Sequence, residues 1–282
     1  MFGFDRQHYY RKVKRTKTRK IIAEQVVALV HQARIRQPRI GTRKLYYMLY
    51  DQLCAFKVGR DRFFDILRAN HLLIKPKRSY HITTWSHHRF RIHPNRIKDM
   101  NIHRPDQVWV SDITYIGKRE KPCYLSLITD AYSKKIVGYE VSDTMCTGNT
   151  VKALKMAQRQ RKSTENLIHH SDRGLQYCSD EYQYYLSKFK IDCSMTQNSD
   201  PYENAIAERV NGILKQEFMI DTYHLDLPLI KEIVSEAINI YNSDRPHWSN
   251  HMLTPNQMHQ QSNLKYKTYQ TKNSSNLLAT TV

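Results

Sequence analysis

The first third of the chain contains three stretches in which apolar residues recur every three or four positions. In residues 19–36 one stripe holds Ile22, Val26, Leu29, Val30 and Ala33. This spacing predicts a helix with one buried face, which ends before Pro38. Residues 42–53 and 58–72 show the same spacing and predict two further helices. Three short helices with a tight turn before a basic third one are typical of a helix-turn-helix-like bundle.

From residue 107 the pattern changes to short apolar or alternating runs that predict strands. The runs at residues 107–116, 123–130 and 135–141 are separated by charged and turn residues, which favours an antiparallel meander. Further strands are expected at 167–172 and 191–194, and helices at 147–161, 180–188, about 201–219 and 228–242. This order predicts an α/β fold with a mixed five-stranded sheet and flanking helices.

The distribution of charge divides the chain sharply. Of its 282 residues, 45 are Lys or Arg and 26 are Asp or Glu, a net charge of +19. Residues 1–105 hold 25 of the basic and 6 of the acidic residues, so the whole imbalance lies there, and residues 106–282 are neutral. A basic arm joined to a neutral globular part indicates a polyanionic partner such as nucleic acid.

These patterns give an expected domain organisation. Residues 1–78 form a basic helical DNA-binding domain, and residues 79–105 form a basic linker with interspersed aromatic side chains. Residues 106–262 form the globular core with its C-terminal helices, and residues 263–282 are a polar tail that we expect to be disordered.

Several classes of protein are excluded by composition. The hydrophobic content of 40% excludes a wholly disordered chain, and no apolar run reaches the roughly 18 residues of a membrane span. The first residues are too polar for a signal peptide. Five scattered cysteines without a C-x-x-C pair argue against a disulfide framework and fit the reducing cytoplasm.

Three acidic residues occur at the ends of, or inside, otherwise apolar elements. Asp112 lies within the first expected strand, Asp172 ends the fourth, and Glu208 lies on the helix expected after residue 200. Each has an ordinary interpretation when taken alone: a strand-edge acid, a turn residue and a solvated helix acid. Asp130 competes with Asp112, because it ends the neighbouring strand, although its surroundings are equally typical of a turn.

The helix that carries Glu208 has a polar stripe opposite its apolar side. Asp200 is expected to cap this helix, with Pro201 in its first turn and Glu203 completing a capping box. The stripe consists of Asn204, Glu208, Asn211 and Lys215, at spacings of four, three and four. Clustered carboxylates are costly unless cations compensate them, and Mg²⁺ prefers such oxygen ligands. Two ions held between them would suit an in-line phosphoryl displacement.

Four stretches carry a specific resemblance: PDQVWVSDITYI, LSLITDAYSKKIVGYEVS, LIHHSDRGLQYCSDEY and SMTQNSDPYENAIAERVNGILKQEF. They closely resemble the catalytic core of the DDE transposases and retroviral integrases. In detail the chain resembles the downstream-frame protein (OrfB) of the bacterial insertion-sequence-three family. The 35 residues between Asp172 and Glu208 match the spacing of that family, and Lys215 matches its basic residue two turns beyond the glutamate.

The resemblance implies a ribonuclease H-like core in which Asp112, Asp172 and Glu208 are the catalytic residues. They would bind two Mg²⁺ ions, for which Mn²⁺ would substitute. Lys215 would contact DNA beside them, and His170, on the face of Asp172, is either a substrate contact or a core histidine. Expected DNA contacts elsewhere are Asn204 and Asn211 in the core, and Arg43, Lys44, Arg60, Arg62 and Arg68 in the arm.

The implied function is a transposase that cleaves the ends of an insertion element and joins them to target DNA. Its partners would be double-stranded DNA, namely the terminal inverted repeats and the target, and further copies of itself in the bacterial nucleoid. No sustained heptad pattern precedes the core, so an upstream-frame (OrfA-type) protein is a possible partner or fusion. No membrane partner is expected.

Two alternative functions stay open at this point. One is a catalytically silent DNA-binding regulator of transposition, although the presence of all three acids argues against it. The other is a ribonuclease H-like nuclease without strand transfer, against which the basic arm and the 35-residue spacing argue.

Overall fold

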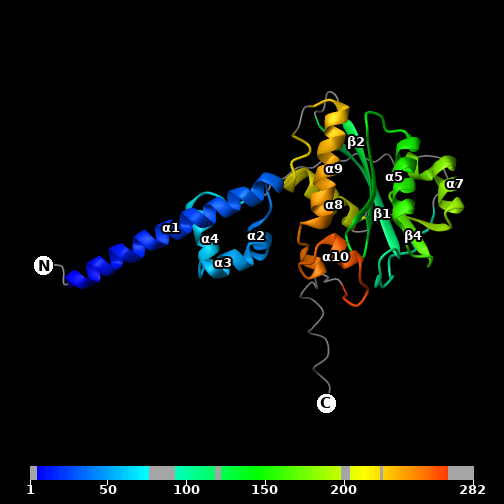
Figure 1. Cartoon of the computed structure of the whole chain (residues 1–282). Helices are drawn as coiled ribbons and strands as arrows, with labels where there is room; N and C mark the ends of the chain where they lie inside the picture. Colours follow the sequence, from blue (N-terminus) through cyan, green and yellow to red (C-terminus); the bar gives the residue numbers. More distant parts are fainter. Residues whose placement is uncertain (1–4, 76–92, 118–121, 198–203, 223–224, 266–282) are drawn as a thin grey trace, which may run out of the picture.

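The computed structural model describes residues 5–75, 93–117, 122–197, 204–222 and 225–265. Its first part, the helical region, contains α1 (Arg6–Arg36), α2 (Thr42–Met48), α3 (Tyr50–Ala55) and α4 (Arg60–Ala69). The apolar sides of these helices meet in one buried cluster, which includes Val26, Leu45, Leu53, Phe63 and Leu67. The expected small helical bundle in front of the core is therefore confirmed (Figure 1). The expected linker and tail lie in part outside the described residues.

Two helices of this region differ from the sequence-based expectation. The first helix begins at Arg6 rather than at residue 19, because residues 6–18 are polar on all sides and give no apolar stripe to detect. The second expected helix is divided at Leu49, whose backbone (φ −99°, ψ 14°) leaves the helical range between α2 and α3. The region thus has four helices where three were expected.

The core is built on one mixed sheet with the strand order β3-β2-β1-β4-β5. Strands β1 (Val108–Ile116), β2 (Cys123–Asp130) and β3 (Ile136–Ser142) form the expected antiparallel meander. Strands β4 (Leu167–Ser171) and β5 (Ile191–Met195) continue the sheet in parallel with β1. The predicted mixed five-stranded sheet is confirmed, and β1 lies at its centre.

Helices cover both faces of this sheet (Figure 1). On one face lie α5 (Thr147–Gln160), α6 (Leu175–Cys178) and α7 (Asp180–Lys188); on the other lie α8 (Ala205–Glu217) and α9 (Leu227–Ser243). The short elements η1 (Trp248–Asn250) and α10 (Pro255–His259) follow. Sequence periodicity missed α6, η1 and α10, because none is long enough to show a helical repeat. Across the described residues, no helix is both long and apolar enough to cross a membrane.

The helix that carries Glu208 begins later than expected. Asn204, at φ −122° and ψ 22°, is not helical and occupies the position before the first residue of α8. The expected cap and capping box at Asp200, Pro201 and Glu203 lie outside the described residues. Within the described residues, the helix starts at Ala205.

Candidate active site

The register of two central strands brings Asp112 and Asp172 together. Strands β1 and β4 are parallel, and Ser111 of β1 is paired with Ser171 of β4. Asp112 and Asp172 each follow one of these paired residues, so they lie side by side near the centre of the sheet. The negative charge of Asp172 acts on Asp112 strongly enough to raise its pKa.

Asp112 is partly buried, and both of its carboxylate oxygens accept hydrogen bonds. The backbone N–H of Ile113 donates to Oδ1 at 2.9 Å, and the amide of Asn211 donates to Oδ2 at 2.7 Å. Burial and the charges of Asp172 and Glu208 nevertheless raise the pKa of Asp112 to about 7. Asp112 is thus close to other negative charges, and a bound cation would reduce the repulsion between them.

Helix α8 contributes the third carboxylate and a lysine. Burial and the charge of Asp172 raise the pKa of Glu208, so the side chains of Glu208 and Asp172 interact electrostatically. Lys215 lies two turns further along α8 and is half-buried. Burial lowers its pKa, whereas the charges of Asp221 and Asp112 raise it. The polar stripe predicted on this helix therefore faces β1.

The donor atoms at this site suit a hard divalent cation. Carboxylate oxygens come from β1, from the end of β4 and from α8, and the buried side-chain carbonyl oxygens of Asn204 and Asn211 have no hydrogen-bond partner among the described residues. Across the described residues, however, no three His, Cys, Asp or Glu side chains are close enough to hold one ion. Binding a cation between the three acids therefore requires their side chains to draw closer together.

Asn204 and Asn211 have partners inside the protein. The amide nitrogen of Asn204 donates to the carbonyl oxygen of Ser111 at 3.1 Å, and that of Asn211 donates to Asp112. Both side chains are buried. Their amides thus join the start and the middle of α8 to the strand that carries Asp112, while the predicted contact with DNA stays a prediction.

The adjacent histidines of β4 point to opposite faces of the sheet and have separate buried partners. His169 Nε2 is 2.6 Å from Ser111 Oγ and 2.9 Å from the hydroxyl of Tyr182. His170 Nδ1 is 2.9 Å from Ser194 Oγ. Both histidines are fully buried, and burial lowers the pKa of His169 to about 3. Of the two interpretations of His170, the structure supports the core histidine.

Asp130, the competitor of Asp112, stabilises a turn. It is fully buried and accepts hydrogen bonds from the backbone N–H of Asp106, at 2.8 Å, and from the N–H and hydroxyl of Ser133. Burial raises its pKa, but His259 and Ser133 outweigh this, and the pKa is lowered overall. Its oxygens are occupied within the fold, and it takes no part in the coupling among the other three acids.

The predicted DNA contacts of the helical region lie mostly on its surface. Arg43, Arg60 and Arg68 are exposed, and Arg62 is half-buried. Arg60 and Arg68 form ion pairs with Asp61 and Asp65 of their own helix. These pairs are solvated, so they leave the guanidinium groups accessible to a phosphate.

Lys44 differs from these arginines, because it lies in a largely buried ion cluster. Its Nζ is 2.8 Å from Oε1 of Glu217, the last residue of α8, whose two carboxylate oxygens also accept from Arg245 at 2.8 and 2.9 Å. The N–H of Arg39 donates to the backbone oxygen of Glu217. The positive charges and hydrogen bonds of Arg245 and Lys44 lower the pKa of Glu217 to about 2, although its burial alone would raise that pKa. Sequence reasoning missed Glu217 and Arg245, because no local pattern indicates a contact between distant segments.

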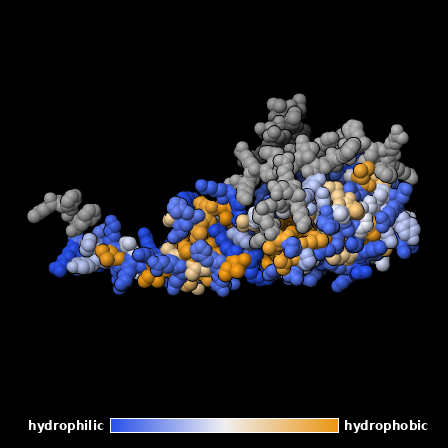
Figure 2. All heavy atoms as spheres, turned by 90° about the horizontal axis from the view of Figure 1, so that it is seen from above, coloured by the Kyte–Doolittle hydropathy of each residue, from blue (hydrophilic) through white to orange (hydrophobic). Residues whose placement is uncertain are grey.

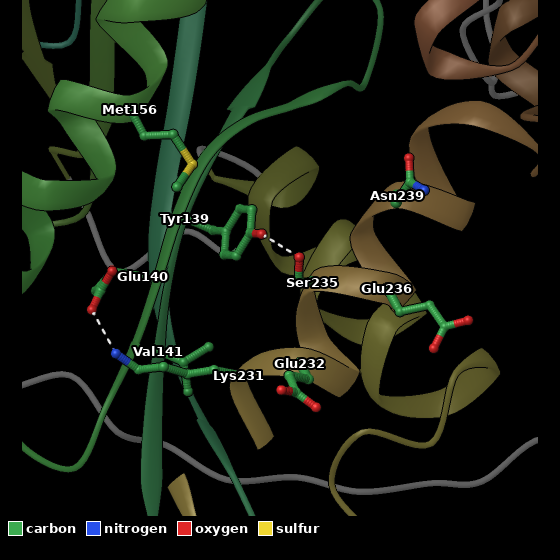
Figure 3. A pocket seen from close by; sticks show the side chains of 9 residues that line it. All are labelled: Tyr139, Glu140, Val141, Met156, Lys231, Glu232, Ser235, Glu236 and Asn239. Carbon is green, nitrogen blue, oxygen red and sulfur yellow. Dashed lines mark hydrogen bonds and ion pairs between the residues drawn. The ribbon is translucent and has the colours of Figure 1, made fainter. Parts of the chain in front are cut away.

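A hollow of about 630 Å³ lies elsewhere, at the outer strand β3 between α5 and α9. Its lining includes the acidic residues Glu140, Glu232 and Glu236, with Lys231 paired to Glu140 (Figure 3). Excess negative charge makes it a poor surface for DNA. It is separate from the carboxylates of β1, β4 and α8.

Comparisons with known proteins agree with this arrangement. The integrase core domain family matches residues 102–201, and a second integrase core domain family matches residues 189–255. The chain is 34% identical to the insertion element IS600 uncharacterized 31 kDa protein of Shigella sonnei, over 88% of this chain and 92% of that protein. It is 30% identical to the transposase InsF for insertion sequence IS3fB of Escherichia coli K12, over 80% and 87%.

A solved structure extends the likeness to the fold. A chain of the simian T-cell lymphotropic virus intasome superposes with a TM-score of 0.51 at 18% identity, covering 83% of this chain and 81% of that chain. The two sequence relatives share more than four-fifths of their own length with this chain. The chain therefore belongs to the integrase-core family of bacterial IS3-type transposases.

Proposed function

We propose that Asp112, Asp172 and Glu208 form the catalytic triad of a metal-dependent DNA cleavage and strand-transfer reaction. The observation that carries this proposal is that, besides burial, the charge of Asp172 raises the pKa of both Asp112 and Glu208, and the charge of Glu208 raises that of Asp112. Acids that raise one another's pKa in a partly buried place are typical of functional sites. In an integrase-core transposase, the reaction to which they contribute is polynucleotidyl transfer.

The triad would hold two Mg²⁺ ions, and Mn²⁺ would substitute for them. When bound, divalent ions would activate a water molecule or a 3′-hydroxyl and would stabilise the leaving oxygen of an in-line displacement. The residues of this chain orient that chemistry. The amide of Asn211 donates to one oxygen of Asp112, and the ammonium group of Lys215, half-buried two turns beyond Glu208, would bind a phosphate of the DNA.

The DNA substrates are the terminal inverted repeats of an insertion element and a target duplex. Arg43, Arg60, Arg62 and Arg68 would bind phosphates of the repeat, because their surface positions leave them accessible. Pairing two element ends calls for more than one copy of the chain, and an upstream-frame protein would be a further partner or fusion. Lys44 would act through its ion pair with Glu217 and not only as a contact with DNA.

The test uses a duplex carrying the inverted repeat that flanks the reading frame in its element. Asp112→Asn, Asp172→Asn and Glu208→Gln should each abolish Mg²⁺-dependent cleavage and joining while DNA binding persists. Glu181→Gln is the matched control, because Glu181 is an exposed acid in the first turn of α7. Full joining by any of the three variants would refute the triad.

The same assay separates the alternative functions. Cleavage of the repeat without any joined product would identify a nuclease without strand transfer. Binding without cleavage, in Mg²⁺ and in Mn²⁺, would identify a silent regulator. Joining by the wild type and its loss in the three variants would exclude both.

A further inference from the structure

The first half of α1 projects from the bundle that the second half of this helix forms with α2, α3 and α4. Residues 5–21 are all exposed, and burial along this helix begins at Ile22. At 1.5 Å per residue, residues 6–20 span about 22 Å. Figure 1 shows this length of helix extending away from α2–α4, and Figure 2 shows it as mostly hydrophilic, with isolated hydrophobic side chains.

This projecting segment is uniformly positive. Residues 6–20 contain eight Lys or Arg and no Asp or Glu. Arg11, Arg15 and Arg19 recur every four residues and therefore lie on one face, where like charges repel and destabilise a helix. At its N-terminus the carboxylate of Asp5 caps the helix by accepting from the backbone N–H of Gln7, but no acidic residue follows within residues 6–20 to offset the cations.

Within the described residues, this segment is stabilised mainly by its N-cap and by its continuity with the packed second half of α1. Buried apolar contacts stabilise most protein helices, and an isolated helix of this length is marginal in water. Here no residue is buried and the charges oppose the helix. A row of negative charges outside the protein would remove the repulsion and favour the helical state.

We propose that residues 6–20 form a second DNA contact, separate from α4, which follows the phosphate backbone and becomes stably helical on binding. Duplex DNA presents one negative charge per about 1.7 Å of its axis, so about 22 Å of duplex offers more phosphates than the eight cations of this segment can neutralise. This inference rests on the proposed action on DNA. It adds a contact that extends the footprint of the helical region beyond its bundle.

The sequence of the segment favours DNA over a helical protein partner. A coiled coil needs apolar residues every three or four positions, but Val13 is followed at those spacings by Thr16 and Lys17. The exposed hydroxyl groups of Tyr9 and Tyr10 add donors for phosphate oxygens. An acidic protein partner is retained as an outcome of the test.

The test replaces Arg11, Arg15 and Arg19 with Gln in the full chain and measures binding to a duplex of arbitrary sequence against salt. Loss of three phosphate contacts should reduce the slope of log K against log salt by about 2.7. Between 50 and 200 mM salt, the wild type should then lose about 40-fold more affinity than the variant. The midpoint of thermal unfolding should be the same for the variant and the wild type, because the three side chains are exposed.

The matched control removes the same charge elsewhere. Lys162, Lys188 and Lys190 are exposed around α5 and α7, on the far side of the core from α1 (Figure 1). Their replacement with Gln should change the slope of log K against log salt by less than about 0.9, the value for one phosphate contact. Equal slopes for the wild type and the Arg11/Arg15/Arg19 variant would overturn the proposal, as would equal effects of the two triple variants.

Amide hydrogen exchange of residues 6–20 supplies an independent measurement. Protection in the full chain should rise when duplex DNA is added, and polyglutamate should not reproduce it. Protection by polyglutamate but not by DNA would assign the segment to an acidic protein and overturn the proposal. If the slope falls as expected but the wild type neither cleaves nor joins, only the proposed catalysis fails.

Discussion

The helical region and the core both carry many ionisable side chains, but they place them in opposite surroundings. Arg60 and Asp61 form an ion pair whose side chains are 69% and 84% exposed, whereas Arg245 and Glu217 are 1% and 17% exposed. A solvated pair contributes little to stability and leaves its charges available to a ligand. A buried pair is costly to break, because each charge depends on the other. The first region is thus suited to a long anionic ligand, and the second to fixed partners.

The largest expected effect comes from Glu217, the buried carboxylate that pairs with Lys44 of the helical region and with Arg245 of the core. Glu217→Ala leaves Arg245 buried without its counter-charge and removes the partner of Lys44. We expect a loss of about 3–5 kcal/mol in the free energy of unfolding, measured with urea. Asp65→Ala, which removes the exposed partner of Arg68, should cost at most about 1 kcal/mol.

The same cluster predicts a dependence on pH. The pKa of Glu217 is lowered from 4.5 to about 2 in the folded protein, so its contribution is complete above pH 4.5. That contribution is lost as the pH falls from 4.5 towards 2, whereas Glu217→Gln cannot titrate. The stability difference between wild type and Glu217→Gln should therefore shrink over this range. A constant difference would contradict the depressed pKa.

Replacing Asp112 should have the opposite effect on stability: the free energy of unfolding should rise although the proposed catalysis is lost. In the metal-free protein, the pKa of Asp112 is raised to about 7 by burial and by the neighbouring acids, so its charge destabilises the fold at higher pH. Because Asp112 is partly exposed, we expect Asp112→Asn to gain only about 1 kcal/mol at pH 8. Thermal unfolding should show this gain vanish below pH 4, where wild-type Asp112 is protonated. A less stable variant at pH 8 would contradict it.

The smallest effect on stability is expected in the helical region. Arg60→Gln and Arg68→Gln should each change the free energy of unfolding by no more than about 0.5 kcal/mol, because both ion pairs are exposed. The affinity for duplex DNA should fall and its salt dependence should weaken. Anisotropy titrations on the proteins used for unfolding would check both statements. Unchanged affinity would remove α4 from the DNA-binding surface.

The sequence was most informative where packing imposes a period. The strands around Asp112 and Asp172 were predicted to within one or two residues, because their runs are apolar and short. The start of α1 was missed because its first half packs against nothing and therefore shows no stripe. The division at Leu49 was also missed, since the apolar spacing continues through it.

For the candidate site, the sequence identified residue types better than their partners. The polar stripe on α8 was predicted, and the structure turns it towards β1, but the bond between Asn211 and Asp112 depends on how the helix is docked. Lys44 was predicted as a DNA contact from its basic neighbourhood, and its pairing with Glu217 depends on residues 173 positions apart. Spacing within an element is encoded locally, whereas contacts between elements follow from the assembled fold.

Helix α8 is held at both of its ends. Asn204 ties its start to Ser111 of the central strand, and Glu217 ties its end to Lys44 of the helical region and to Arg245. Glu208 lies between these two anchors, so any displacement of the helical region would act on the end of α8 opposite to the one that Asn204 holds against the central strand.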